Sequence, residues 1–177
     1  MKLYIVRHGE TDWNAKELIQ GDTEVPLNEK GRVQANVVKE KLKEIPFDIC
    51  YTSPLSRAKD TAEIIVGNTC PVFIANELIE RDYGNMEGTS FSNLDRAIYW
   101  DYLKNTNEKG VEPVRNLLSR TRNFLESIVE KHKDKTVLIV THGSTLRALH
   151  YGLMGYTEKE EFLKLGVKNC QIFQYEI

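Results

Sequence analysis

The chain has 177 residues, of which 41% are apolar and 28% charged, and its formal net charge is −2 with a pI near 6.1. This length and balance are typical of one soluble globular domain with a substantial core, and they exclude a disordered chain. A mildly acidic protein is not expected to bind nucleic acid, and no apolar run is long enough to cross a bilayer, so we expect neither partner.

The three cysteines and the first residues indicate the compartment. Cys50, Cys70 and Cys170 are widely separated, odd in number and without metal-ligand spacing, so we expect reduced thiols that serve as small packing residues. A single lysine before a very short apolar stretch is not typical of a secretory signal. Together these features predict a cytoplasmic protein.

The first predicted elements are a strand and an amphipathic helix. Leu3 to Val6 is a short, continuous apolar run rich in strand formers. Residues 28–44 carry apolar side chains at helical spacing, and we expect these to face the core: Val33, Val37, Val38 and Leu42.

The next predicted strand runs from Phe47 to Thr52. Ser53 and Pro54 follow it and are predicted to be the N-cap and first position of a helix. That helix has an apolar face formed by Leu55, Ala58, Ala62 and Ile65. A third strand is predicted from Pro71 to Ala75.

The second half continues the alternation of helix and strand. Ser92 to Lys104 is a weaker helix signal with an aromatic cluster at Tyr99, Trp100 and Tyr102, which either lines a substrate cleft or packs on the body. Pro113 is predicted to open a long helix to about residue 132. Its inner side is predicted to carry Val114, Leu117, Leu118, Thr121, Leu125 and Ile128. A strongly apolar strand (Thr136–Thr141), a helix (about Ser144 to Leu153) and a closing strand ("CQIFQYEI") complete the chain.

Strands separated by helices predict an α/β fold with a largely parallel sheet covered on both faces. No internal repeat or change of composition marks a second domain, so residues 1–177 are expected to form one domain. In such sheets functional groups gather beyond the carboxyl ends of the strands.

Three predicted strand ends carry cationic or reactive side chains. Arg7 and His8 follow the first strand, Arg57 lies in the first turn after the second, and His142 follows the strand "TVLIVT". Converging guanidinium groups bind phosphate oxygens, and a histidine among arginines is expected to stay neutral and nucleophilic. The pattern predicts phosphoryl transfer through a phosphohistidine. Taken singly, Arg57 would be a surface residue paired with Asp60 and either histidine a structural loop residue.

A general acid is needed to protonate the leaving oxygen. The turn-rich stretch after the third strand offers Glu77, Glu80, Asp82 and Glu87, and spacing alone does not choose among them.

Four ordered motifs resemble the signature blocks of the histidine phosphatase superfamily, also called phosphoglycerate mutase-like: "VRHGETDWN", "SPLSRAKDTA", "LIERDYGNMEG" and "VLIVTHGSTLRAL". The likeness covers nearly the whole chain. It implies a three-layer α/β/α sandwich around a mostly parallel sheet with one antiparallel edge strand.

The resemblance also implies roles for individual residues. It maps the nucleophile to His8, the phosphate pocket to Arg7, Arg57 and His142, and the acid to Glu80. It maps substrate contacts to Asn14, Thr11, Gln20 and Gly21, while Tyr83 either stacks on a substrate or packs under the loop. No metal or other cofactor is implied.

The resemblance leaves phosphatase and mutase to be distinguished. Mutases of this family have a longer insertion before the second histidine and an adjacent arginine pair; this chain has neither, only a short cover segment at about 88–110. A shorter cover leaves a phosphohistidine open to water, which favours a phosphatase acting on a small phosphorylated metabolite. The alternatives are a cofactor-dependent phosphoglycerate mutase, a zinc hydrolase using His8, His142 and Glu80, and a non-catalytic phosphate-binding module. The partner is expected to be a small phosphate ester, bound by a monomer or homodimer.

Overall fold

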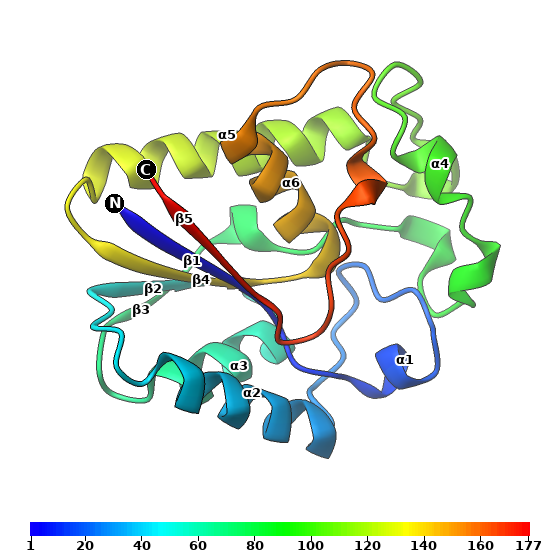
Figure 1. The fold of residues 1–177 in the computed structure, drawn as a ribbon. Helices are drawn as coiled ribbons and strands as arrows, with labels where there is room; N and C mark the ends of the chain where they lie inside the picture. Colours follow the sequence, from blue (N-terminus) through cyan, green and yellow to red (C-terminus); the bar gives the residue numbers. More distant parts are fainter.

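The computed structural model describes residues 1–177, with a five-stranded sheet between two layers of helices (Figure 1). β5 pairs antiparallel with β1, and every other neighbouring pair is parallel, so the expected α/β/α sandwich with an antiparallel edge strand is confirmed. The strands follow the spatial order β3-β2-β4-β1-β5: β1 (Lys2–Arg7), β2 (Ile49–Thr52), β3 (Val72–Ile74), β4 (Thr136–Thr141) and β5 (Ile172–Glu176).

Two long helices cover each face of the sheet. α2 (Glu29–Leu42) and α3 (Ser56–Val66) lie on one face, and α5 (Val114–Lys131) and α6 (Gly143–Met154) lie on the other (Figure 1). Two short helices, α1 (Asp12–Ala15) and α4 (Arg96–Tyr99), lie beyond the carboxyl ends of the strands. None of the helices combines the length and apolar character required to cross a membrane.

The central strands are apolar throughout because both of their faces are covered. In β1, Leu3 and Ile5 pack toward α5 and α6, whereas Tyr4 and Val6 pack toward α2 and α3. Alternate side chains of a strand point to opposite faces, so a strand between two helical layers needs apolar residues at every position. This burial fixes where β1 ends and therefore the positions of its last residue, Arg7, and of the next residue, His8.

The inner face of α2 differs in part from the prediction. Val38 and Leu42 are buried as expected, but Val33 and Val37 are 63% and 49% exposed. The buried face instead begins with small residues, because the chain after β1 comes so close that a Cβ on Gly31 would lie 2.1 Å from the Glu10 carbonyl oxygen. Close packing selects glycine there, and a hydrophobicity pattern does not detect it.

The start of α3 was also predicted too early. The helix begins at Ser56 with Leu55 as its N-cap residue, and Ser53 caps nothing. The Ser53 hydroxyl instead lies 2.7 Å from His142 Nε2. The same hydroxyl accepts the backbone N–H of Leu55 at 3.3 Å, so Ser53 forms a turn before the helix and holds His142 instead of capping the helix.

The prediction of a helix over residues 92–104 is wrong for most of that range. Only α4 (Arg96–Tyr99) is α-helical there. The Asp101 carboxylate accepts the backbone N–H groups of Leu103 and Lys104, which forms a turn in place of another helical turn. The long helix predicted from Pro113 is confirmed as α5, with all six of its predicted inner residues buried.

Candidate functional site

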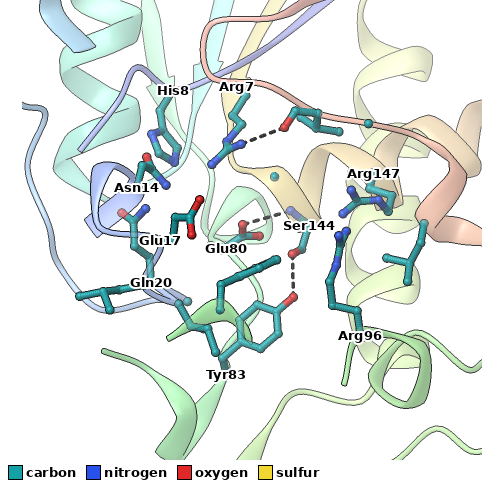
Figure 2. Close-up of a pocket in the computed structure, with 18 of the residues that line it drawn as sticks. Arg7, His8, Asn14, Glu17, Gln20, Glu80, Tyr83, Arg96, Ser144 and Arg147 are labelled. Carbon is teal, nitrogen blue, oxygen red and sulfur yellow. Dashed lines mark hydrogen bonds between the residues drawn. The ribbon is translucent and has the colours of Figure 1, made fainter. Parts of the chain in front are cut away.

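A cavity of about 590 Å³ opens beyond the carboxyl ends of β1 and β4 (Figure 2). Its lining comes from segments far apart in the chain: the end of β1 and the loop after it, the start of α3, the loop after β3, the cover segment, α6, and the segment between α6 and β5. The sequence-predicted residues among them are Arg7, His8, Asn14, Gln20, Gly21, Arg57, Glu80 and Tyr83.

His8 is the first residue after β1 and is only 2% exposed. Its Nδ1 lies 2.6 Å from the Gly9 carbonyl oxygen, which can only accept, so we assign the ring proton to Nδ1. The lone pair of the neutral ring is then on Nε2. Burial, followed by the charges of Arg57 and Arg7, lowers the pKa of His8 well below its usual value, so the ring is neutral and able to act as a nucleophile near pH 7.

His142 follows β4 and lies beside His8, with ring centroids 5.1 Å apart. Arg57 Nε donates to its Nδ1 at 3.2 Å, so Nε2 carries the proton and donates to the Ser53 hydroxyl. Burial is the largest cause that lowers the pKa of His142, followed by the charge of Arg57. His142 is fully buried behind the cavity wall, and this neutral ring fixes the Arg57 side chain from behind.

Arg7 and Arg57 supply positive charge to the cavity, and neither forms an ion pair with a carboxylate. Arg57 donates to the carbonyl oxygens of Gly21 and Thr23, and burial lowers its pKa to about 10. Arg7 donates to the Val167 carbonyl at 2.8 Å, while its buried Nε has no partner. The buried Arg57 guanidinium and the half-buried Arg7 guanidinium are held by carbonyl oxygens and not by carboxylates, so both retain their full charge for an anion.

Two acidic residues line the cavity, Glu17 and Glu80 (Figure 2), and Glu80 is the one that lies beside Arg7. Its carboxylate accepts the backbone N–H groups of Ser144 and Thr145 at 3.0 Å each, at the start of α6. A Cβ on Gly143 would lie 3.7 Å from the Arg7 guanidinium and 3.8 Å from Glu80 Oε2, so both side chains converge over this glycine. The other acidic residues considered from the sequence, Glu77, Asp82 and Glu87, do not line the cavity.

The predicted substrate contacts have different positions. Asn14, Gln20, Gly21 and Tyr83 line the cavity, whereas Thr11 is fully buried and does not. The Thr11 hydroxyl donates to Gln20 and accepts the backbone N–H of Asn14, so Thr11 supports two lining residues from behind. The Tyr83 hydroxyl lies 3.0 Å from the Ser144 hydroxyl.

The aromatic cluster divides between the two predicted roles. Trp100 is buried and lines the cavity, so it both packs and forms a wall. Tyr99 is buried elsewhere and Tyr102 packs against Arg115 outside the cavity.

Several lining or supporting residues were missed from the sequence. Asn169 Nδ2 donates to the His8 carbonyl and to Asn14 Oδ1, which ties the loop before β5 to the end of β1. Glu17, Arg96, Ser144 and Arg147 line the cavity as well. No sequence signal marks Asn169 or Arg96, while Ser144 and Arg147 lie within the fourth quoted motif.

The geometry does not fit a zinc centre at this site. His8, His142 and Glu80 do not bring three ligand atoms together, since both ring nitrogens of His142 already have protein partners. The one close acidic group comprises Asp22, Asp82 and Glu87. Glu87 in this group accepts the backbone N–H groups of Asp22 and Thr23, so its carboxylate stabilises the loop that contains them.

Comparison with known proteins gives one consistent result. The family model of the histidine phosphatase superfamily (branch 1) matches residues 3–177. An uncharacterized phosphatase, PhoE, of Bacillus subtilis is 38% identical over 82% of this chain and 73% of its own length. The metal-independent phosphoserine phosphatase of Arabidopsis thaliana is 37% identical over 94% and 74%, respectively.

A solved structure agrees with these relatives. Phosphoserine phosphatase of Entamoeba histolytica, in complex with 3-phosphoglyceric acid, superposes with a TM-score of 0.83 and 30% identity over 98% of this chain and 89% of that one. Phosphoglycerate mutases that depend on 2,3-bisphosphoglycerate also match, at 32–33% identity.

Proposed function

This chain belongs to the histidine phosphatase superfamily and is a phosphatase that acts through a phosphohistidine, and from that premise we propose that His8 is its nucleophile and Glu80 its general acid. One observation carries the assignment. The Gly9 carbonyl holds the His8 ring with its proton on Nδ1, which leaves the lone pair on Nε2. This imidazole is neutral, and the two arginines near it, Arg7 and Arg57, form no ion pair.

In the first step, the phosphoryl group of a small monoester lies against Arg7 and Arg57. His8 Nε2 attacks phosphorus, the new P–N bond forms, and the P–O bond to the leaving group breaks. Glu80 donates its proton to the departing oxygen, since an alkoxide is a poor leaving group without one. The Asn14 amide, whose oxygen is occupied by Thr11 and Asn169, directs its N–H groups toward the phosphoryl oxygens.

In the second step, water attacks the phosphohistidine. The Glu80 carboxylate takes a proton from that water, the P–N bond breaks, and inorganic phosphate leaves. Glu80 is thereby protonated again and His8 recovers its lone pair, so the cycle closes. The guanidinium groups stabilise the charge on the transferring group throughout, the role that metal ions have in other phosphoryl-transfer sites.

Hydrolysis is favoured over transfer back to substrate by the short cover. The cover segment, about residues 88–110, contributes only Phe91, Ser92, Arg96 and Trp100 to the cavity lining. Water therefore reaches the phosphohistidine without displacing a long insertion.

The test combines turnover with trapping of the intermediate. The protein is incubated in EDTA with a panel of phosphomonoesters while phosphate release is measured, and samples are quenched in base for peptide mass analysis. We expect release in EDTA and one PO₃ group on the His8 peptide that is lost in acid. His8→Asn should abolish both signals, and His132→Asn is the matched control, because His132 lies far from the cavity and contacts Tyr51.

Three results would contradict the proposal. Turnover that persists in His8→Asn would remove His8 as nucleophile, and activity abolished by EDTA would indicate a metal. Phosphoryl transfer between 2,3-bisphosphoglycerate and phosphoglycerate that exceeds hydrolysis would favour a mutase.

A further inference from the structure

Two arginines outside the predicted phosphate site share one wall of the cavity. Arg96 comes from α4 and Arg147 from α6, and Figure 2 shows them side by side, across the cavity from His8 and Asn14. They are 51 positions apart in the chain, so only the fold brings them together.

Arg147 is only 6% exposed, and its surroundings do not neutralise its charge. Its Nε and Nη2 donate to the Leu165 carbonyl, at 3.3 and 2.9 Å, and its guanidinium lies 5.1 Å from the Trp100 ring centroid. Nη1 has no protein partner and is not enclosed. The carbonyl and the indole thus orient the guanidinium and leave one edge of it for a ligand.

Arg96 adds a second charge rather than a counter-charge. Its guanidinium lies 5.3 Å from the Phe91 ring centroid, and it forms no ion pair. Burial first, and then the nearby Arg96, lower the pKa of Arg147 to about 10. Two adjacent positive charges, one of them buried, are costly in free energy unless an anion in the cavity binds to both.

The separation from the phosphate site limits the size of the ligand. Gly143 lies under Arg7 and Glu80, and Arg147 is four residues farther along α6, which corresponds to about 6 Å at 1.5 Å per residue. A second anionic group bound there would be only a few bonds from the phosphorus atom.

We propose that Arg96 and Arg147 form a second anion-binding position, and that the substrate is a compact phosphate monoester carrying a carboxylate or a second phosphate. This inference rests on the proposed function, because it places the reacting phosphoryl group at His8. It assigns Arg96 and Arg147 to substrate selection and not to bond breaking.

The test compares substrates that differ in one group. 3-Phosphoglycerate has a carboxylate where glycerol 3-phosphate has a hydroxymethyl group, and glycerol 1,3-bisphosphate carries a second phosphate on the oxygen of that hydroxymethyl group. We expect kcat/KM of the wild-type protein to be at least tenfold higher for 3-phosphoglycerate or glycerol 1,3-bisphosphate, which carry a second anionic group, than for glycerol 3-phosphate. Arg96→Met should reduce that ratio by about 10- to 100-fold, the range of a hydrogen bond to a charged group.

Arg147→Met removes hydrogen bonds to Leu165 and can affect folding, so Arg147→Lys is the second variant, because lysine keeps the charge and loses the planar fork. We expect an intermediate reduction of the same ratio. Arg122→Met is the matched control, since Arg122 is exposed and packs on Tyr156 outside the cavity.

Equal ratios in wild type, Arg96→Met and Arg147→Lys for both the carboxylate and the bisphosphate would overturn the inference. That result is distinct from failure of the proposed function, which would instead be seen as His8-independent hydrolysis of glycerol 3-phosphate.

Discussion

Acidification from pH 7.5 to 5.5 should destabilise the folded protein through two buried imidazoles. His8 and His142 are enclosed, and burial together with Arg57 and Arg7 lowers the pKa of each well below 6.5. In the unfolded chain both return to about 6.5. The unfolded state therefore binds more protons below pH 6.5, and the stabilisation present above that pH is lost as the pH falls.

The magnitude follows from linkage. Each histidine that stays neutral when folded costs about 1.4 kcal/mol of unfolding free energy between pH 7.5 and 5.5, so the pair costs about 2.7 kcal/mol. That is a large part of the ~5–15 kcal/mol typical of a whole domain. In His8→Asn, the carboxamide can still donate to the Gly9 carbonyl but does not titrate, so the acid loss should shrink by about 1.4 kcal/mol.

Urea unfolding followed by tryptophan fluorescence at pH 7.5, 6.5 and 5.5 gives the required free energies. His150, whose pKa burial also lowers, is present in both proteins and cancels in the difference. An identical acid loss in wild type and His8→Asn would refute the reasoning, because it would mean that the His8 ring is protonated in the folded state.

Other predictions concern single residues at and behind the site. Glu80→Gln should lower kcat/KM for alkyl phosphates by about 10²- to 10⁴-fold, yet spare phosphoenzyme formation from nitrophenyl phosphate, whose leaving group needs no proton; equal losses on both would place the acid elsewhere. Asn169→Ala removes the donor to the His8 carbonyl and to Asn14, so kcat should fall about tenfold with an unchanged urea midpoint. Gly31→Ala should destabilise the fold by about 1–3 kcal/mol in urea, since the new methyl group meets the Glu10 carbonyl.

The sheet could be predicted from the sequence because its central strands are buried on both sides. Such strands, like β1 and β4, need apolar residues throughout; β1 then ends at Arg7, and β4 is followed by His142. The segment near residues 92–104 was mispredicted because local side chains decide it. Asp101 binds backbone N–H groups that a continuing helix would use, and no periodicity reports that competition.

The phosphate-facing half of the site was predictable, whereas the opposite wall was not. Arg7 ends β1, His8 follows it, and Arg57 lies in the first turn of the helix after β2, so chain order places them at one edge of the sheet. Arg96 lies on a one-turn helix in an irregular segment, and Arg147 is a buried residue of α6 between the apolar Leu146 and Ala148. Their proximity depends on how Trp100 of the cover segment packs against Arg147 of α6, which no local pattern encodes.

The two ends of the polypeptide meet at the edge of the sheet remote from His8. β1 and β5 are paired so that Lys2 lies opposite Glu176, and the amino group of Met1 contacts the Ile177 carbonyl (Figure 1). A short peptide joining these ends would permit circular permutation, with new termini opened in an exposed loop such as the one after α5. Carrier proteins or surface anchors attached at either terminus would likewise stand clear of the entrance that substrates use.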